Sequence, residues 1–318
     1  MSDQLVIHGA RPIGGPKPVD VHIAGGRIAR VAPSGTLPDV QQSIDATGLW
    51  LTPGLCESHL HLFCGGEAFD RLTLVTVHSA ADVAKASRAF SEAGPASGRV
   101  CARAAKDGLP GEGTRPDRRA LDAVLSDRPM VILSADGHAA WTNMAALEEA
   151  GLVADLPALA EAEGGLASDG APNSEGRESG ACRLVTRLTP SCGRNGPGTS
   201  GAEPEVPPTD AERARDKPAI QRALDACVVN GITTAVNMGG NAYQADVLTE
   251  LAEESNLPIR VGLPMTIGAD ADNARIDEPL DIAAGPLVGR LRFGRVKMLA
   301  LLLSSPLRSL VLVPPRFL

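Results

Sequence analysis

The chain has 318 residues, more than one domain of typical size uses, so its length predicts two domains or one large α/β barrel with additions. Hydrophobic residues make up 43% of the chain and charged residues 21%, a balance that excludes fibrous, wholly disordered and membrane-embedded proteins. Acidic residues outnumber basic ones 38 to 30, which gives a net charge of −8, and no Lys/Arg cluster offsets this charge. We therefore expect neither nucleic acid nor a membrane as a partner.

The N-terminal part of the chain has the pattern of a small β-unit. Short apolar or alternating runs are separated by turn signals, and Gly25-Gly26 joins two of these runs as a hairpin turn. The predicted strands are Leu5–Gly9, Val19–Ile23, Ile28–Val31, Gln42–Asp45 and Trp50–Thr52. We predict that residues 1–53 form an antiparallel β-unit that is too small to be stable alone.

The pattern changes after Pro53, where the run LCESHLHLF predicts a buried strand that leads into a loop at Gly65-Gly66. Helical and strand-like segments alternate beyond this loop. They are a helix at Ala80–Ala93, a helix at Arg115–Leu125, a strand at Met130–Ala135, and a helix capped by Asn143 that ends before Gly151.

Regular patterning disappears between about residues 163 and 218. Residues 189–210 contain nine Gly or Pro in 22 positions, which indicates a flexible surface insertion. Strands and helices then alternate again, which favours parallel β/α architecture. The predicted elements are helices at Pro218–Val229 and Gln244–Ser255, and strands at Gly231–Met238, Pro258–Met265 and Leu291–Leu299.

The strongest chemical signal is the pair His59 and His61 at the end of the first strand after Pro53. Residues i and i+2 of a strand point to the same face, so both imidazoles project together while Leu60 turns into the packing. Two imidazoles on one face can bind one divalent metal ion. An isolated pair would favour two ordinary strand histidines. The apolar run before this pair and the glycines after it favour a metal site.

A resemblance to the amidohydrolase superfamily, and within it to amidohydrolase family 3, rests on this pair and on further motifs. Upstream motifs are the hairpin GGRIARV and the lead-in DATGLWLTPG. Downstream motifs are LDAVLSDRP, DGHAAWTNMAAL, NGITTAVNMGG and GRVKM. The resemblance covers about residues 4–298.

This resemblance implies an α/β fold: part of a (β/α)8 TIM-type barrel of the metal-dependent hydrolase kind, with a small N-terminal β-sandwich, or composite, domain. Residues 1–53 would belong to the sandwich. Residues 54–298 would form the first half of the barrel, including an insertion at about 65–218. The implied reaction is hydrolysis of a non-peptide C–N bond in an amide or cyclic amide, and the implied partner is a small-molecule substrate of this type.

The resemblance also implies roles for individual residues. His59 and His61 would be ligands of a divalent metal, which we expect to be zinc, as one or two ions. Lys297 falls where the family carries a metal-bridging lysine that is carbamylated in many members; a strand-end lysine that reaches solvent is the alternative. His138 follows an apolar strand and would bind or orient the substrate, unless it is a loop histidine bonded to backbone. The family's proton-transferring aspartate comes from a late strand that is not recognisable in this sequence, so Asp136 and His138 are the first candidates for an alternative base.

The C-terminal part departs from the family pattern. No histidine follows His138, and residues 299–318 are an atypical apolar tail, as expected of a premature or frameshifted end. Four barrel strands can be placed, so we expect open sheet edges to pair in a homo-oligomer. Two interpretations remain: an active amidohydrolase, or a truncated, non-catalytic remnant that binds a metal or ligand.

The six cysteines form no CxxC pair, and the N-terminus lacks a basic region followed by an apolar core. The apolar stretch Leu299–Val313 is too short for a membrane span and contains Pro306. We therefore expect a cytoplasmic protein with reduced cysteines.

Overall fold

The computed structural model describes residues 4–75, 77, 79–94, 98–105, 118–134, 139–151, 153, 175–177, 207–267, 273–299 and 309–312. The chain divides into two compact units, Met1–Leu55 and Cys56–Leu318. Residues 189–206 of the predicted flexible segment lie outside the described residues, and so do Asp136 and His138. No helix in the described ranges is long and apolar enough to cross a membrane.

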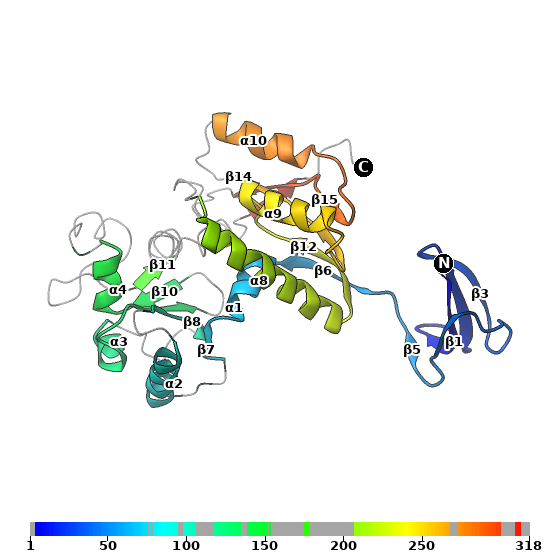
Figure 1. Ribbon diagram of the computed structural model, residues 1–318, viewed down its shortest axis with the longest axis horizontal. Coiled ribbons are helices and arrows are strands. Elements are labelled where there is room, and N and C mark those ends of the chain that lie inside the picture. The colour runs from blue at the N-terminus through cyan, green and yellow to red at the C-terminus, as the bar shows by residue number, and fades with distance from the viewer. Residues whose placement is uncertain are drawn as a thin grey trace. The chain divides into compact units, whose positions relative to one another are not determined.

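The first unit is a five-stranded sheet (Figure 1, blue). Its strands are β1 (Gln4–Pro12), β2 (Val19–Ala24), β3 (Arg27–Pro33), β4 (Gln42–Asp45) and β5 (Trp50–Leu51). Strand β2 pairs antiparallel with β1 and β3 across the predicted hairpin, which is confirmed. The prediction of a wholly antiparallel unit is wrong, because β4 and β5 both pair parallel with β1.

The second unit contains a four-stranded sheet in the order β15-β13-β12-β6, and a second sheet in the order β14-β16-β17. The bounds are β6 (Leu55–Leu60), β12 (Ile232–Asn237), β13 (Arg260–Gly262), β14 (Met265–Ile267), β15 (Leu291–Arg292), β16 (Val296–Leu299) and β17 (Ser309–Leu312). Strands β12, β13 and β15 are parallel. After short irregular segments, β14 follows β13 and β16 follows β15 along the chain, and β14 and β16 also pair parallel.

Helices α8 (Asp210–Val229), α9 (Ala242–Glu253) and α10 (Asn273–Ala283) alternate with these strands along the chain. Helices α8 and α9 lie side by side in Figure 1. They pack on the strands through one hydrophobic cluster, to which Leu224, Leu248, Ala235 and Val261 belong. The predicted alternation of strands with helices is confirmed. The described residues form a mixed α/β fold without a closed barrel.

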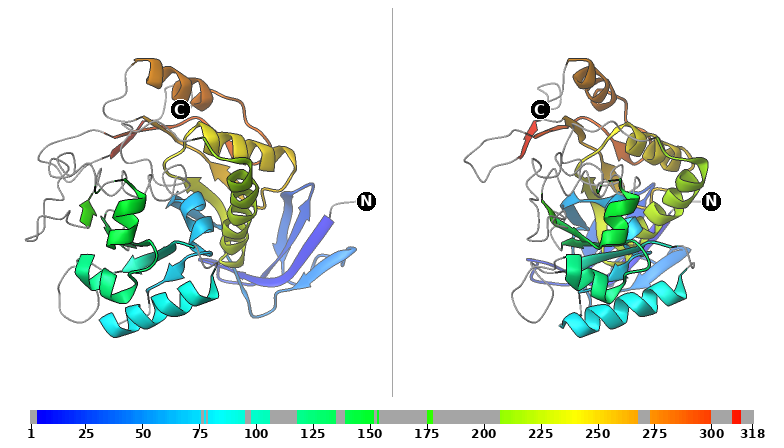
Figure 2. Two further views of the ribbon diagram at one scale, coloured as in Figure 1. Left: turned by 60° about the vertical axis from the view of Figure 1, so that its left-hand side comes forward. Right: turned by 90° about the vertical axis from the view of Figure 1, so that its left-hand side faces the viewer.

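A five-stranded sheet in the order β11-β10-β9-β8-β7 is formed by the segment between β6 and α8. Its elements are β7 (Leu72–Thr73), α2 (Ala80–Ala93), β8 (Val100–Ala105), α3 (Arg118–Val124), β9 (Met130–Ser134), β10 (Ala139–Thr142), α4 (Met144–Glu149) and β11 (Glu175–Arg177). Figure 2 shows α2 in cyan alongside the strands of this sheet. Helix α2 matches its predicted bounds, and α4 has the predicted cap, because Asn143 accepts a hydrogen bond from the Ala146 N–H.

Alternation along β9 separates the two faces of this sheet. Ile132 packs in a cluster with Val83 of α2 and Leu121 of α3. The neighbouring Val131 packs in a different cluster with Leu147 of α4. Because successive strand residues point to opposite faces, α2 and α3 cover one face and α4 covers the other.

Several predicted elements differ from the structure. The strands expected at Pro258–Met265 and Leu291–Leu299 are each divided in two, and the expected buried strand, β6, is mostly exposed. The expected loop at Gly65-Gly66 is part of helix α1 (Leu62–Ala68). A Cβ at Gly66 would lie 2.5 Å from the carbonyl oxygen of Ala219, so this glycine allows α1 to approach the backbone of α8 closely. Helix α8 begins at Asp210 rather than Pro218, because the side chain and backbone of Thr209 form a capping box with Glu212.

Candidate metal centre

The two candidate histidines lie where β6 ends and α1 begins. Their ring centroids are 5.3 Å apart, with an angle of 80° between the ring planes. His61 is the N-cap residue of α1 and is half-buried, whereas His59 is exposed. With their rings this close, the two imidazoles are candidate ligands of one metal ion.

Lys297 lies on β16 and is only 7% exposed. Backbone hydrogen bonds connect its strand to β6 through β12 and β14: the Met238 N–H donates to the Leu60 carbonyl oxygen, and the Thr266 N–H donates to the Gly240 carbonyl oxygen. Thr266 pairs in register with Lys297.

Burial lowers the pKa of Lys297. Burial, followed by the charges of Lys297 and His59, lowers the pKa of His61 to about 4. His61 is therefore neutral at pH 7, which is the form of imidazole that binds metals.

The residue that follows β12, Met238, acts on His61. A backbone hydrogen bond with Met238 raises the pKa of the His61 ring, against the larger lowering by burial. The N–H of Met238 donates to the carbonyl oxygen of Leu60 at 2.8 Å. Metal-binding histidines commonly use one ring nitrogen in this way, which leaves the other for the metal.

Thr266 adds a further polar atom near this position. It is the register partner of Lys297 in the parallel pair β14·β16, so both side chains lie on the same face of the sheet. Its hydroxyl oxygen is buried and has no hydrogen-bond partner. A buried hydroxyl without a partner is costly unless a ligand, a modified side chain or water satisfies it.

These donors fit part of a divalent metal site. Two imidazoles are typical zinc ligands, and catalytic zinc sites use three protein ligands and a water. A charged lysine is not a ligand, so Lys297 would have to contribute as a neutral amine or a carbamate. Within the described part of the chain, no group of three or more His, Cys, Asp or Glu side chains could bind a metal ion. The sequence-predicted Asp136 and His138 lie outside that part.

Several polar residues near the histidines escaped the sequence analysis. Arg103 of β8 donates from Nη1 to the carbonyl oxygen of Cys64 in α1 at 3.1 Å. Asn237 accepts a hydrogen bond from the N–H of Leu62 at 2.8 Å. The available signal was a polar residue, Asn237, ending the apolar strand in the NGITTAVNMGG motif.

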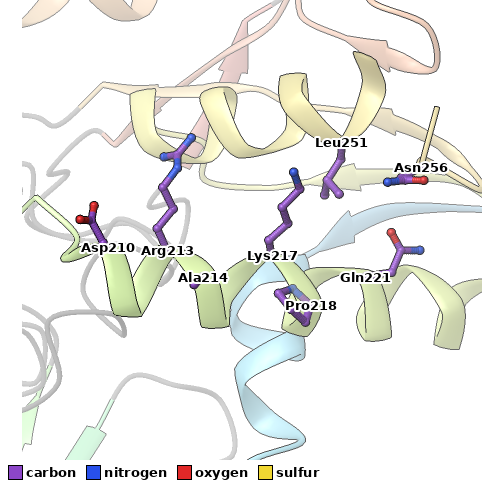
Figure 3. A pocket seen from close by; sticks show the side chains of 8 residues that line it. All are labelled: Asp210, Arg213, Ala214, Lys217, Pro218, Gln221, Leu251 and Asn256. Carbon is purple, nitrogen blue, oxygen red and sulfur yellow. The ribbon is translucent and has the colours of Figure 1, made fainter. Parts of the chain in front are cut away.

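A cavity of about 500 Å³ lies away from these residues, between α8 and α9 (Figure 3). It is lined by Asp210, Arg213, Ala214, Lys217, Pro218, Gln221, Leu251 and Asn256. Arg213 pairs with Glu250, and Lys217 pairs with Glu250 and Glu254. Both cations therefore already have carboxylate partners. No imidazole is among the described residues that line this cavity, so they do not offer the metal ligands that His59 and His61 offer.

Comparison with protein families gives a match to the amidohydrolase family over residues 42–307. Among curated proteins, 58 residues are 43% identical to the dihydroorotase of Mycobacterium tuberculosis, which is 18% of this chain and 14% of that enzyme. A further 52-residue match, 42% identical, is to the imidazolonepropionase of Cupriavidus metallidurans and covers 15% of this chain and 12% of that enzyme.

Among solved structures, an uncharacterized metal-dependent hydrolase from Pyrococcus horikoshii matches with a TM-score of 0.59 and 17% sequence identity. The match covers 91% of this chain and 53% of that one. A metal-dependent hydrolase from Pyrococcus furiosus gives a TM-score of 0.56 at 17% identity, over 91% of this chain and 55% of that one. The chain thus spans about half the length of these structures, and the likeness concerns the fold.

Proposed function

Because the chain belongs to the amidohydrolase family, we propose that it hydrolyses a non-peptide C–N bond, in an amide or cyclic amide, with the help of a divalent metal ion. The observation that carries this proposal is the pair His59 and His61 where β6 ends, with ring centroids 5.3 Å apart, and the burial of Lys297 on β16 supports it. Local similarity to a dihydroorotase and an imidazolonepropionase supports the same reaction class.

The proposal includes the barrel. Strands β6 and β12, then β13 with β14 and β15 with β16, would be strands one to four of a (β/α)8 barrel. The C-terminal ends of barrel strands are where such enzymes bind their substrates. His61 follows β6 and Lys297 lies on the fourth strand, as this arrangement requires. The first unit would be part of a composite β-sandwich domain.

The metal ligands would be His59, His61 and Lys297, with zinc as the expected ion. Lys297 would contribute most readily as a carbamate, formed when its neutral amine nitrogen attacks the carbon of CO2 and releases a proton. The lowered pKa of Lys297 supports this step, because it increases the neutral fraction. The unpartnered Thr266 hydroxyl would then find an acceptor in the carbamate.

When bound, the metal ion would lower the pKa of a water molecule and polarise the scissile carbonyl group. His61, in its neutral form, would present one ring nitrogen to the ion. Asp136 is our candidate for moving a proton from the water to the leaving amine, and His138 for orienting the substrate.

Zinc content tests this proposal. Replacing His59 and His61 together by Ala is expected to abolish stoichiometric zinc in the purified protein, as measured by elemental analysis. The matched control replaces His8 and His22, two histidines of the first unit, and should retain zinc. Zinc retained by the His59/His61 variant would place the metal elsewhere and refute this assignment.

A further inference from the structure

Two buried amide side chains, Asn237 and Gln244, form a hydrogen-bonded chain that ends on the backbone beside His61. Asn237, the last residue of β12, is 2% exposed, and Gln244 of α9 is 1% exposed. The Asn237 side-chain N–H donates to the Gln244 side-chain oxygen at 2.8 Å. The Asn237 oxygen accepts from the Leu62 N–H, also at 2.8 Å.

The backbone on both sides of His61 is therefore held by consecutive residues at the end of β12. The N–H of Met238 donates to the carbonyl oxygen of Leu60, which precedes His61. The side chain of Asn237 binds the N–H of Leu62, which follows His61. This arrangement restricts the backbone rotations at His61 that would swing its imidazole away from His59.

The first N–H groups of a helix have no partner within the helix. In α1 the N-cap residue, His61, makes no side-chain capping bond of its own. Asn237 supplies one instead, from 175 positions along the chain. A Ser or Asp at the N-cap position would accept from a later N–H group of the first turn, but it would remove the imidazole.

The amide pair also specifies direction. Buried amides are costly unless their donors and acceptors are paired. Because Gln244 accepts from the Asn237 nitrogen, it fixes the amide so that the oxygen faces Leu62. The backbone N–H of Gln244 donates to the side-chain oxygen of Asn241, the N-cap residue of α9. This bond fixes the start of the helix that carries Gln244.

From this geometry we propose that Asn237 and Gln244 are positioning residues that hold His61 in place for metal binding. The inference rests on the proposed metal site. A residue that orients a ligand in this way typically changes metal affinity 10–100-fold when it is replaced. A residue that only caps α1 would change stability and leave affinity unchanged.

The test measures the zinc Kd of the full chain by competition with a chelating dye, and the visible spectrum of the cobalt(II) form. Asn237→Leu, which keeps the branching and the number of side-chain heavy atoms and removes both hydrogen bonds, should raise the Kd roughly 10–100-fold and alter the cobalt spectrum. Asn237→Asp keeps an acceptor for the Leu62 N–H and should raise the Kd less than Asn237→Leu does.

The matched control is Asn143→Leu. Asn143 is also a fully buried asparagine, and its oxygen accepts from the N–H groups of Met130 and Ala146. This substitution should lower the melting temperature and leave the zinc Kd unchanged. If Asn237→Leu does not fold, Gln244→Met replaces it, because it leaves Asn237 in place but removes the group that orients it, and the Kd should still rise.

The outcomes separate the two proposals. Wild-type protein that binds neither zinc nor cobalt overturns the metal site, and this inference with it. Wild-type binding with an unchanged Kd in both Asn237→Leu and Gln244→Met overturns this inference alone. An equal rise in Kd for Asn143→Leu would show a general loss of folding and would also overturn it.

Discussion

Asp20 is the buried carboxylate on which the loops of the first unit converge. It accepts hydrogen bonds from the N–H groups of Gly9, Gly35, Thr36 and Leu37 at 2.9–3.2 Å. Asp20→Asn would turn an amide N–H toward some of these donors, so we expect the free energy of unfolding of this unit to fall by roughly 1–3 kcal/mol. The control is Asp45→Asn, because Asp45 is exposed and serves one local turn.

The effect of Asp20 should depend on pH. Burial raises the pKa of Asp20, but the backbone hydrogen bonds outweigh burial and lower the pKa below 3.8. Its contribution is therefore complete above the unfolded-state pKa and is lost as pH falls through the lowered folded-state value. The stability difference between wild type and Asp20→Asn should be largest near pH 7 and shrink below about pH 4. A constant difference down to acid pH would contradict this explanation. The free energy of unfolding of the first unit is measured by the fluorescence of Trp50 in a Trp141→Phe background.

Replacing Lys297 should have opposite effects on the stability of the metal-free protein and on zinc binding, as is typical of a functional residue. Its ammonium group is buried with a lowered pKa, so Lys297→Met should raise the free energy of unfolding of the metal-free protein by about 0.5–2 kcal/mol. The same change should weaken zinc retention. Urea unfolding in the presence of a chelator measures the first effect. A destabilised metal-free variant would mean that the lysine has a structural role.

Sequence reasoning selected His59 and His61 because the i, i+2 rule is local. It could not find Asn237, since the partner of this side chain, Leu62, is 175 positions away. The same limit applies to Thr266, whose position beside Lys297 follows from the pairing of β14 with β16. Candidate ligands can be read from local spacing, whereas the groups that we propose to orient them depend on the tertiary fold.

Among the elements, α1 and α8 depend on one glycine for their close approach. A Cβ at Gly66 would lie 2.5 Å from the Ala219 oxygen and 2.7 Å from the Ala219 carbonyl carbon, and rigid helix backbone cannot yield easily. Gly66→Ala should therefore destabilise the protein by about 1–3 kcal/mol. Thermal melting measures this loss.

The adjacent glycine of the same helix is a matched control. A Cβ at Gly65 would meet nothing within 4 Å, so Gly65→Ala should stabilise the protein by about 0.5–1 kcal/mol through helix propensity. If both substitutions shift stability in the same direction, the close approach of α1 to α8 is not the cause.

Elements with strong local signals could be predicted closely. The side chain of Ser79 caps helix α2 by accepting a hydrogen bond from the Asp82 N–H. This local signal is why the bounds of α2 could be predicted from the sequence. The start of α8 was missed because its capping box, Thr209 with Glu212, follows a Gly- and Pro-rich segment that resembles a loop. The glycines of α1 were also misread, since only contact with α8 shows why Gly66 is needed there.

At the scale of the whole molecule, the alternation of strands and helices predicts parallel β/α architecture, and β12, β13 and β15 do pair parallel in the sheet β15-β13-β12-β6. Each strand lies next to the one that follows it in this series. The five-stranded sheet in the order β11-β10-β9-β8-β7 could not be predicted, because its strands β10 and β11 are short and pair across segments without periodic patterning. Local periodicity therefore predicts the repeated strand–helix unit, whereas the sheet that contains β7 to β11 depends on pairing between segments far apart in the sequence.

The two compact units should respond differently to metal. A ligand that binds only the folded state stabilises it by about 2.7 kcal/mol at a concentration of 100 times its Kd. The candidate ligands all lie within Cys56–Leu318, so zinc should stabilise that unit. Each unit contains one tryptophan, Trp50 in the first and Trp141 in the second, which is only 1% exposed.

Single-tryptophan variants can follow each unit separately. In Trp50→Phe, where Trp141 is the reporter, zinc should raise the melting temperature. In Trp141→Phe, where Trp50 is the reporter, the transition should not move, because the first unit contains none of the proposed ligands. The shift should disappear when His59 and His61 are both replaced by Ala. Equal shifts at both tryptophans would instead show that the units unfold as one cooperative body, since the binding energy of a single site would then stabilise both.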